Sequence, residues 1–157
     1  LAHLVGLGDR RLGSLAGFTP AVEAARVCLV GIRDLDSGEK ANLRESGVHV
    51  FTMADVDRHG MADVAERAVS IAGGHTAEIH LSFDIDAADP SIAEGTGTKK
   101  RGGLTYREAH LLMEVLAESG RLASLDMVEV NPLEDVHNAT AELASELIQS
   151  ALGKRIY

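Results

Sequence analysis

The feature that most constrains the fold is a regular alternation of short apolar runs with stretches that are apolar at helical spacing. The apolar runs are continuous and rich in β-branched residues, which is typical of strands buried in a parallel sheet. Strands that alternate with helices in this way predict an α/β fold, with a mainly parallel sheet covered on both faces. The predicted strands span residues 26–32, 48–53, 77–86 and 122–130, and the predicted helices span residues 38–47, 63–72, 105–120 and 139–153.

The third helix carries the clearest local signals. Thr105 and Glu108 have the spacing of a capping box, in which each side chain accepts a hydrogen bond from the other residue's backbone. Gly120 ends the same stretch, and Gly47 ends the first helix in the same way. The length of 157 residues, without a repeat or a long linker, predicts a single domain over residues 1–157.

Composition limits the classes of partner. Asp and Glu number 24 against 15 Lys and Arg, and the formal net charge of −9 argues against nucleic-acid binding and against docking on an anionic membrane. The single Cys28 lies in an apolar run, which favours a buried, unreactive thiol and a cytoplasmic protein. No run is long enough to span a membrane, and the chain begins with Leu1, which indicates processing or a piece of a longer protein.

Ligands of parallel sheets bind beyond the carboxyl ends of the strands, and acids follow three of the predicted strands. Asp84 and Asp86 come at the end of the third strand. In an extended chain these two side chains point the same way, and two carboxylates so close need a compensating cation or proton. Oxygen ligands suit Mn²⁺ or Mg²⁺, although a solvated strand end is the commoner meaning of two acids at this spacing. Asp89, before a proline, is interpreted as a turn residue.

Acids also follow the first and the fourth strand. Asp34, Asp36 and Glu39 come after the first strand, where they either face the same site or stabilise a helix N-terminus. Glu129 lies inside the predicted fourth strand among apolar residues, so a cationic substrate group is a suitable partner for it. The seven histidines show no metal-binding spacing, and His80 and His110 are interpreted as structural.

A longer pattern surrounds these acids. The stretch SFDIDAADPSIAEGTGTKKRGGLTYRE resembles a signature of the ureohydrolase family of arginases and agmatinases, and LVGIRDLDSGE, TMADVDRHGM and MVEVNPLED also resemble arginases. The resemblance covers essentially the whole chain. The Glu-Val-Asn-Pro sequence favours arginase over agmatinase, which usually has Ser in place of Asn. The implied fold is the three-layer αβα sandwich of arginases, of which this chain resembles the C-terminal half.

The resemblance implies hydrolysis of L-arginine to urea and L-ornithine by a hydroxide that bridges two Mn²⁺ ions. Asp84 and Asp86 match metal ligands, with Asp84 shared by both ions. Glu129 matches the acid that binds the guanidinium group. Asp36 and Glu39 match acids near the substrate's α-amino group.

Further positions are assigned in the same way. Thr98 matches a threonine that lines the site, and Arg107 and Glu108 match positions at subunit contacts, which implies a trimer or hexamer. Glu94 and Lys99 stand where the family has prolines, and their loss is expected to loosen this loop. Lys99 begins a run of three basic residues, which is expected to repel a cationic substrate.

The family motifs that supply the remaining metal ligands are absent from this sequence, so the chain alone is expected to lack a complete two-metal site. Two alternatives to an arginase remain open: an agmatinase or other guanidino hydrolase, and a non-catalytic relative that acts by assembly with another chain. A phosphotransferase or glycosyltransferase use of the two aspartates is disfavoured, because no phosphate-binding glycine loop precedes a helix.

Overall fold

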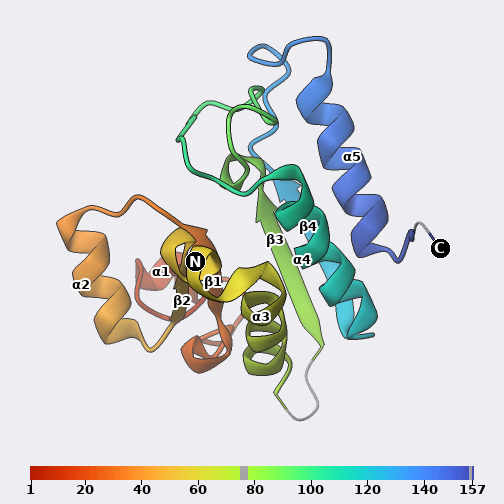
Figure 1. Cartoon of the computed structure of the whole chain (residues 1–157). Coiled ribbons are helices and arrows are strands. Elements are labelled where there is room, and N and C mark those ends of the chain that lie inside the picture. The colour runs from red at the N-terminus through yellow and green to blue at the C-terminus, as the bar shows by residue number, and fades with distance from the viewer. Residues whose placement is uncertain (75–77, 156) are drawn as a thin grey trace.

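The computed structural model describes residues 1–74, 78–155 and 157. It contains two pairs of parallel strands, and each pair forms its own two-stranded sheet. The predicted parallel pairing is confirmed, but the structure divides the predicted single sheet into two (Figure 1). The first sheet consists of β1 (Cys28–Ile32) and β2 (His49–Thr52), and the second of β3 (Ile79–Asp84) and β4 (Leu122–Val128).

Helices connect these strands in the predicted order. Three of the helix starts have a complete capping box, in which the first side chain and the side chain three residues later bond each other's backbone. The box at Thr105 and Glu108 confirms the prediction made from their spacing. The helices are α1 (Arg10–Gly13), α2 (Ser37–Ser46), α3 (Met53–Gly73), α4 (Tyr106–Glu118) and α5 (Ala139–Ala151), with short 3₁₀ turns η1 (Ala24–Arg26) and η2 (Ile85–Ala87).

Helix α3 differs most from its prediction, because it begins at Met53, directly after β2, and not at residue 63. Thr52 and Asp55 form the capping box that starts it. The helix is interrupted at Gly60, whose φ of 80° and ψ of 152° are not helical. Its first part is therefore separated by this kink from the part that the apolar spacing indicated.

Strands β3 and β4 are shorter than predicted. Strand β3 ends at Asp84, because η2 follows at once, and β4 ends at Val128. Ala77, the predicted first residue of the third strand, lies outside the described residues, as does His75.

The core lies between the strands and the helices α3, α4 and α5. Helix α4 packs against α3 on one side and α5 on the other, as Figure 1 also shows. The face of β3 and β4 that carries His80 and Ser124 is exposed, so the described residues do not provide the expected cover on that face. The most deeply buried large side chains are Ile85, Leu104, Met113, Leu147, Val56 and Val64.

Among the helices in the described ranges, no segment combines the length and the apolar character that crossing a membrane requires.

Candidate active site at the carboxyl ends of the strands

The structure places Asp84 and Asp86 together, but by a turn and not by an extended chain. Asp84 is the last residue of β3, and Asp86 lies within η2. The Asp84 Oδ1 atom accepts a hydrogen bond of 3.0 Å from the backbone N–H of Asp86. Thr98 Oγ1 donates a hydrogen bond of 2.6 Å to Asp86 Oδ2, and Thr98 lines the same cavity as the two aspartates.

The electrostatics of Asp84 favour a positively charged partner. Its partial burial raises the pKa of Asp84, the N–H of Asp86 opposes that rise, and the neighbouring charges of Asp86 and Glu129 raise the pKa further. Both aspartates line a cavity of about 1440 Å³. Burial and the neighbouring acids disfavour the charged form of Asp84, and a bound cation would stabilise that form. A carboxylate that binds a metal ion is expected to have this property.

Glu129 lies close enough to affect Asp84, but the sequence interpretation of its position is wrong. It is the first residue after β4 and is exposed, so it is not an acid enclosed within a strand. Its backbone has a φ of 65°, a left-handed conformation that residues other than glycine rarely adopt. Such conformations cost roughly 1–3 kcal/mol and concentrate at functional sites. The turn directs the chain away from β4 at the same end of the sheet as Asp84.

The acids after β1 have mainly a capping role in this structure. Asp36 accepts a hydrogen bond of 2.8 Å from the N–H of Glu39, and Glu39 accepts one of 2.8 Å from the N–H of Asp36. This geometry agrees with the helix N-terminus considered from the sequence. Glu39 also lines the cavity that contains Asp84. Asp34 forms an ion pair of 2.6 Å with Lys100 Nζ.

Arg33 joins the two sheets at the site, a role that the sequence did not reveal. Its Nη2 atom donates hydrogen bonds of 2.5 Å to the carbonyl of Asp86 and of 2.7 Å to the carbonyl of Lys100. Arg33 follows β1, whereas both acceptors follow β3. The only sequence signal was an arginine among the acids after the first strand. Because its acceptors are backbone carbonyls, no pattern of side chains identifies them.

The loop between β3 and α4 is held from within by Asp89. One oxygen of Asp89 accepts from the N–H of Ser91 at 3.0 Å, and the other accepts from the N–H of Gly102 at 2.8 Å. These hydrogen bonds, with Ser91 contributing most, lower the pKa of Asp89 to about 2. The predicted turn role of Asp89 is confirmed.

The basic run in this loop is paired with acids. Lys99 Nζ lies 3.1 Å from Glu134 Oε2, and Lys100 forms the ion pair with Asp34 described above. Lys99 and Lys100 lie at the rim of the cavity, and their positive charges are partly neutralised by these acids.

The remaining residues of interest are structural. His80 contacts Ser124 Oγ at 2.8 Å and Asp126 Oδ2 at 3.1 Å, on the exposed face of the second sheet. His110 is buried and contacts Ser150 Oγ at 2.9 Å. Burial raises the pKa of Cys28 to about 11, which agrees with an unreactive thiol.

The carboxylate oxygens are of the type that a divalent metal ion prefers, but the described residues provide too few of them for a complete site. Within the described ranges, no group of three or more His, Cys, Asp or Glu side chains is arranged to hold a metal ion. Asp84 and Asp86 offer oxygen donors, one of them partly desolvated and both lining one cavity. Oxygen donors are what Mn²⁺ and Mg²⁺ prefer, but a complete site needs more of them.

Comparison with known proteins gives the family to which this geometry belongs. A family model described as the Arginase family matches residues 14–153. The arginase of Bacillus caldovelox is 44% identical over 156 residues, which are 99% of this chain and 52% of that protein. The arginase of Brevibacillus brevis is 42% identical over the same shares of each chain.

Solved structures agree with these sequence matches. The native structure of arginase from Bacillus caldovelox at pH 5.6 has a TM-score of 0.95 and 44% identity, over 99% of this chain and 52% of that one. A crystal structure of Entamoeba histolytica arginase in complex with L-ornithine has a TM-score of 0.87 and 33% identity, over 98% of this chain and 51% of that one. The fold is thus the α/β fold of arginases. The chain belongs to the arginase family, and it spans about half the length of the relatives that it matches.

Proposed function

We propose that this chain contributes to an arginase, a hydrolase that converts L-arginine to urea and L-ornithine. One observation carries the proposal: Asp84 and Asp86 share a cavity at the carboxyl end of β3, in a chain of the arginase family. Because the chain spans about half of its relatives, activity is proposed for the complete domain. By itself the chain is expected to be inactive.

Two Mn²⁺ ions are the proposed cofactors of the complete domain. Asp84 and Asp86 would hold them from this half, and the other ligands would come from the rest of the domain. The bound metal supplies water activated for attack near neutral pH. Thr98 fixes the orientation of Asp86 through its hydrogen bond of 2.6 Å, so it is a positioning residue for this carboxylate.

The proposed substrate is a cation, and acids surround the site. We assign Glu129 to the guanidinium group, because it is exposed beside Asp84 and follows the end of β4. A carboxylate can accept two parallel hydrogen bonds from a guanidinium group, which orients its central carbon. Asp36 and Glu39 remain assigned to the substrate's α-amino group. Both residues keep their capping hydrogen bonds in this assignment.

The experiment measures metal content and urea release in the complete arginase domain. We expect the Mn²⁺-loaded protein to release urea from L-arginine. We expect Asp84→Ala to reduce both bound Mn²⁺ and urea release by at least about tenfold, because loss of even an outer-shell partner of a metal ligand costs about 10–100-fold. Asp63→Ala is the matched control, because Asp63 is an exposed acid on α3 that pairs with Arg67. No urea from the wild type, together with unchanged metal content in Asp84→Ala, would refute the proposal.

The same assay distinguishes the alternatives. Release of urea from agmatine in preference to L-arginine would indicate an agmatinase. The paired state of Lys99 and Lys100 limits their repulsion of a cationic substrate, which supports an arginine-type substrate despite the basic run. We further propose that the complete protein is a trimer or hexamer, with Arg107 and Glu108 near the subunit contacts. Its proposed location is the cytoplasm.

A further inference from the structure

Two loops lie side by side beyond the carboxyl ends of β3 and β4, and each carries a residue of the proposed site (Figure 1). The loop of residues 94–99, between η2 and α4, includes Thr98, which donates a hydrogen bond to Asp86. The loop of residues 129–138, between β4 and α5, begins with Glu129, which we assign to the guanidinium group. The spacing of Glu129 and the site aspartates therefore depends on how these two loops are joined.

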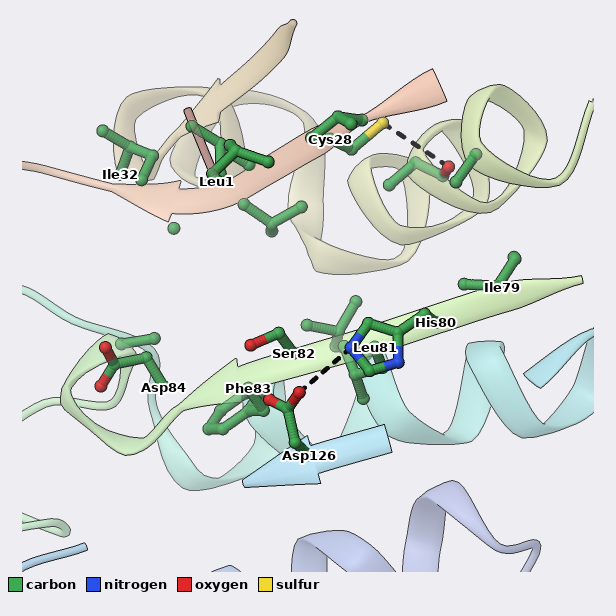
Figure 2. A pocket seen from close by; sticks show the side chains of 18 of the residues that line it. Leu1, Cys28, Ile32, Ile79, His80, Leu81, Ser82, Phe83, Asp84 and Asp126 are labelled. Atoms are coloured by element: carbon green, nitrogen blue, oxygen red, sulfur yellow. Dashed lines mark hydrogen bonds and ion pairs between the residues drawn. The ribbon is translucent and has the colours of Figure 1, made fainter. Parts of the chain in front are cut away.

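A backbone hydrogen bond joins the two loops directly. The N–H of Asn131 donates to the carbonyl of Gly95 at 2.8 Å. Asn131 is two residues after Glu129, whose φ of 65° persists only where the surrounding structure imposes it. Asp84 lies at the end of β3, as Figure 2 shows, and is close enough to Glu129 for their charges to interact. The bond from Asn131 to Gly95 thus ties the strained turn of Glu129 to the loop that carries Thr98.

Gly95 is held in turn by the side chain of Thr140. The N–H of Gly95 donates a buried hydrogen bond of 2.7 Å to Thr140 Oγ1, and Thr140 is fully buried. A Cβ atom at Gly95 would lie 2.7 Å from the Cβ atom of Asp135 and 2.9 Å from Thr140 Oγ1, so a residue with a side chain does not fit there. Gly95 is therefore a junction, because its carbonyl binds the loop of Glu129 and its N–H binds α5.

Thr140 is itself fixed by Asp135. The residue before α5, Asn138, has a left-handed conformation, and its side chain makes no capping bond. Asp135 takes this role, since its Oδ1 accepts from the N–H of Thr140 at 3.0 Å and its Oδ2 from the N–H of Ala141 at 3.0 Å. Bonds of this kind satisfy the free N–H groups of a first helical turn. The Thr140 hydroxyl thus has a fixed position at the start of α5.

We infer that Thr140 is a positioning residue for the reaction, an inference that rests on the proposed function. Its hydroxyl holds Gly95, and Gly95 holds the turn of Glu129 beside the acids at the end of β3. Without the hydroxyl, the buried N–H of Gly95 loses its acceptor, which favours a shift of both loops. A misplacement of about 1 Å can reduce an enzymatic rate by roughly 100-fold, even when the mutation lies far from the chemistry. Asp84 and Asp86 belong to β3 and η2, so their binding of Mn²⁺ should be preserved.

Thr140→Val in the complete arginase domain tests the inference, because valine has nearly the shape of threonine but lacks the hydroxyl. We expect kcat/KM for L-arginine to fall at least about tenfold, with bound Mn²⁺ unchanged. Thr140→Ser keeps the hydroxyl and should restore most of the activity. Ser150→Ala is the control, because it removes a buried hydroxyl near the other end of α5 and should leave kcat/KM unchanged. Rescue by serine, together with the normal activity of the control, separates positioning from a general loss of packing.

Hydrogen exchange gives a readout that does not depend on activity. In Thr140→Val the backbone amides of Gly95 and Asn131 should exchange at least about tenfold faster than in the wild type, because the bonds that protect them are weakened. The amide of Asp86, which donates to Asp84, should exchange at its wild-type rate. Unchanged kcat/KM in Thr140→Val, or unchanged exchange at Gly95 and Asn131, would overturn the inference while the proposed function stands. A wild type that releases no urea would refute the proposed function and the inference with it.

Discussion

Replacing Gly103 with alanine tests how the loop after β3 is held beside the site. A Cβ atom at Gly103 would lie 2.6 Å from the carbonyl oxygen of Ala87 and 2.6 Å from the carbonyl carbon of Ala88. Ordinary contact begins near 3.4 Å, so the backbones must separate by about 0.8 Å. The two segments are joined at this point, since the N–H of Leu104 donates to the carbonyl of Ala87 at 2.9 Å. Neither side of the clash is a flexible side chain, so it cannot be relieved by a change of rotamer.

We expect Gly103→Ala to lower the free energy of unfolding by about 2 kcal/mol, within the range of about 1–3 kcal/mol for overpacked sites. With a urea m-value of about 2 kcal/mol/M, the unfolding midpoint falls by about 1 M. Gly97→Ala is the control, because a Cβ atom there meets nothing within 4 Å, and its midpoint should shift by less than about 0.3 M. If Gly103→Ala unfolds at the same urea concentration as Gly97→Ala, the close approach of the two backbones does not hold the loop.

Three other substitutions are expected to change stability in defined ways. The pKa of Asp89 is about 2 in the folded protein and about 3.9 in the unfolded chain, so its contribution is present above about pH 4 and is lost as the pH falls toward 2. Asp89→Asn should therefore lower stability at pH 7 and flatten its dependence on pH between 4 and 2, as measured by urea unfolding across that range. Thr105→Ala removes the hydroxyl that accepts from the N–H of Glu108 and should cost about 1 kcal/mol in urea unfolding, whereas loss of less than about 0.3 kcal/mol would contradict a capping role. Ile85→Ala empties a fully buried position between the two site aspartates and should cost about 2–5 kcal/mol, with an unchanged thermal midpoint as the refuting result.

The order of strands and helices could be predicted because it depends on local patterns. Apolar runs located all four strands, and the spacing of Thr105 and Glu108 located the start of α4. The start of α3 was missed because the run that ends at Met53 reads as continuous strand. Its capping box uses Asp55, whereas the familiar pattern has Glu or Gln at that position. The division into two sheets depends on contacts between distant segments, which no local pattern reports.

The sequence singled out residues that the structure brings together, but it did not predict their geometry. Asp84, Asp86 and Thr98 lie together, but η2 and not an extended strand brings Asp86 to Asp84. The positive φ of Glu129 could not be anticipated, because residues of this type adopt it only when the surrounding structure imposes it. Arg33 was missed for a related reason, since its partners are backbone carbonyls whose positions depend on the finished loop.

Glu94 and Lys99, for which the resemblance to the family implies prolines, bear on how firmly the site is held. A proline in a compatible loop stabilises a protein by about 0.4–1 kcal/mol, because it restricts the unfolded chain. An exposed ion pair contributes about 0–1 kcal/mol, and Lys99 and Lys100 each form one with an acid from another loop. These magnitudes are similar, so the ion pair of Lys99 can contribute about as much stability as one proline in the loop. A proline and an ion pair stabilise the loop in different ways. A proline restricts one segment, whereas the ion pair of Lys100 with Asp34 connects the loop after β3 to the loop after β1. Together with Arg33, it connects the loops that follow β1 and β3 at the end where the acids lie.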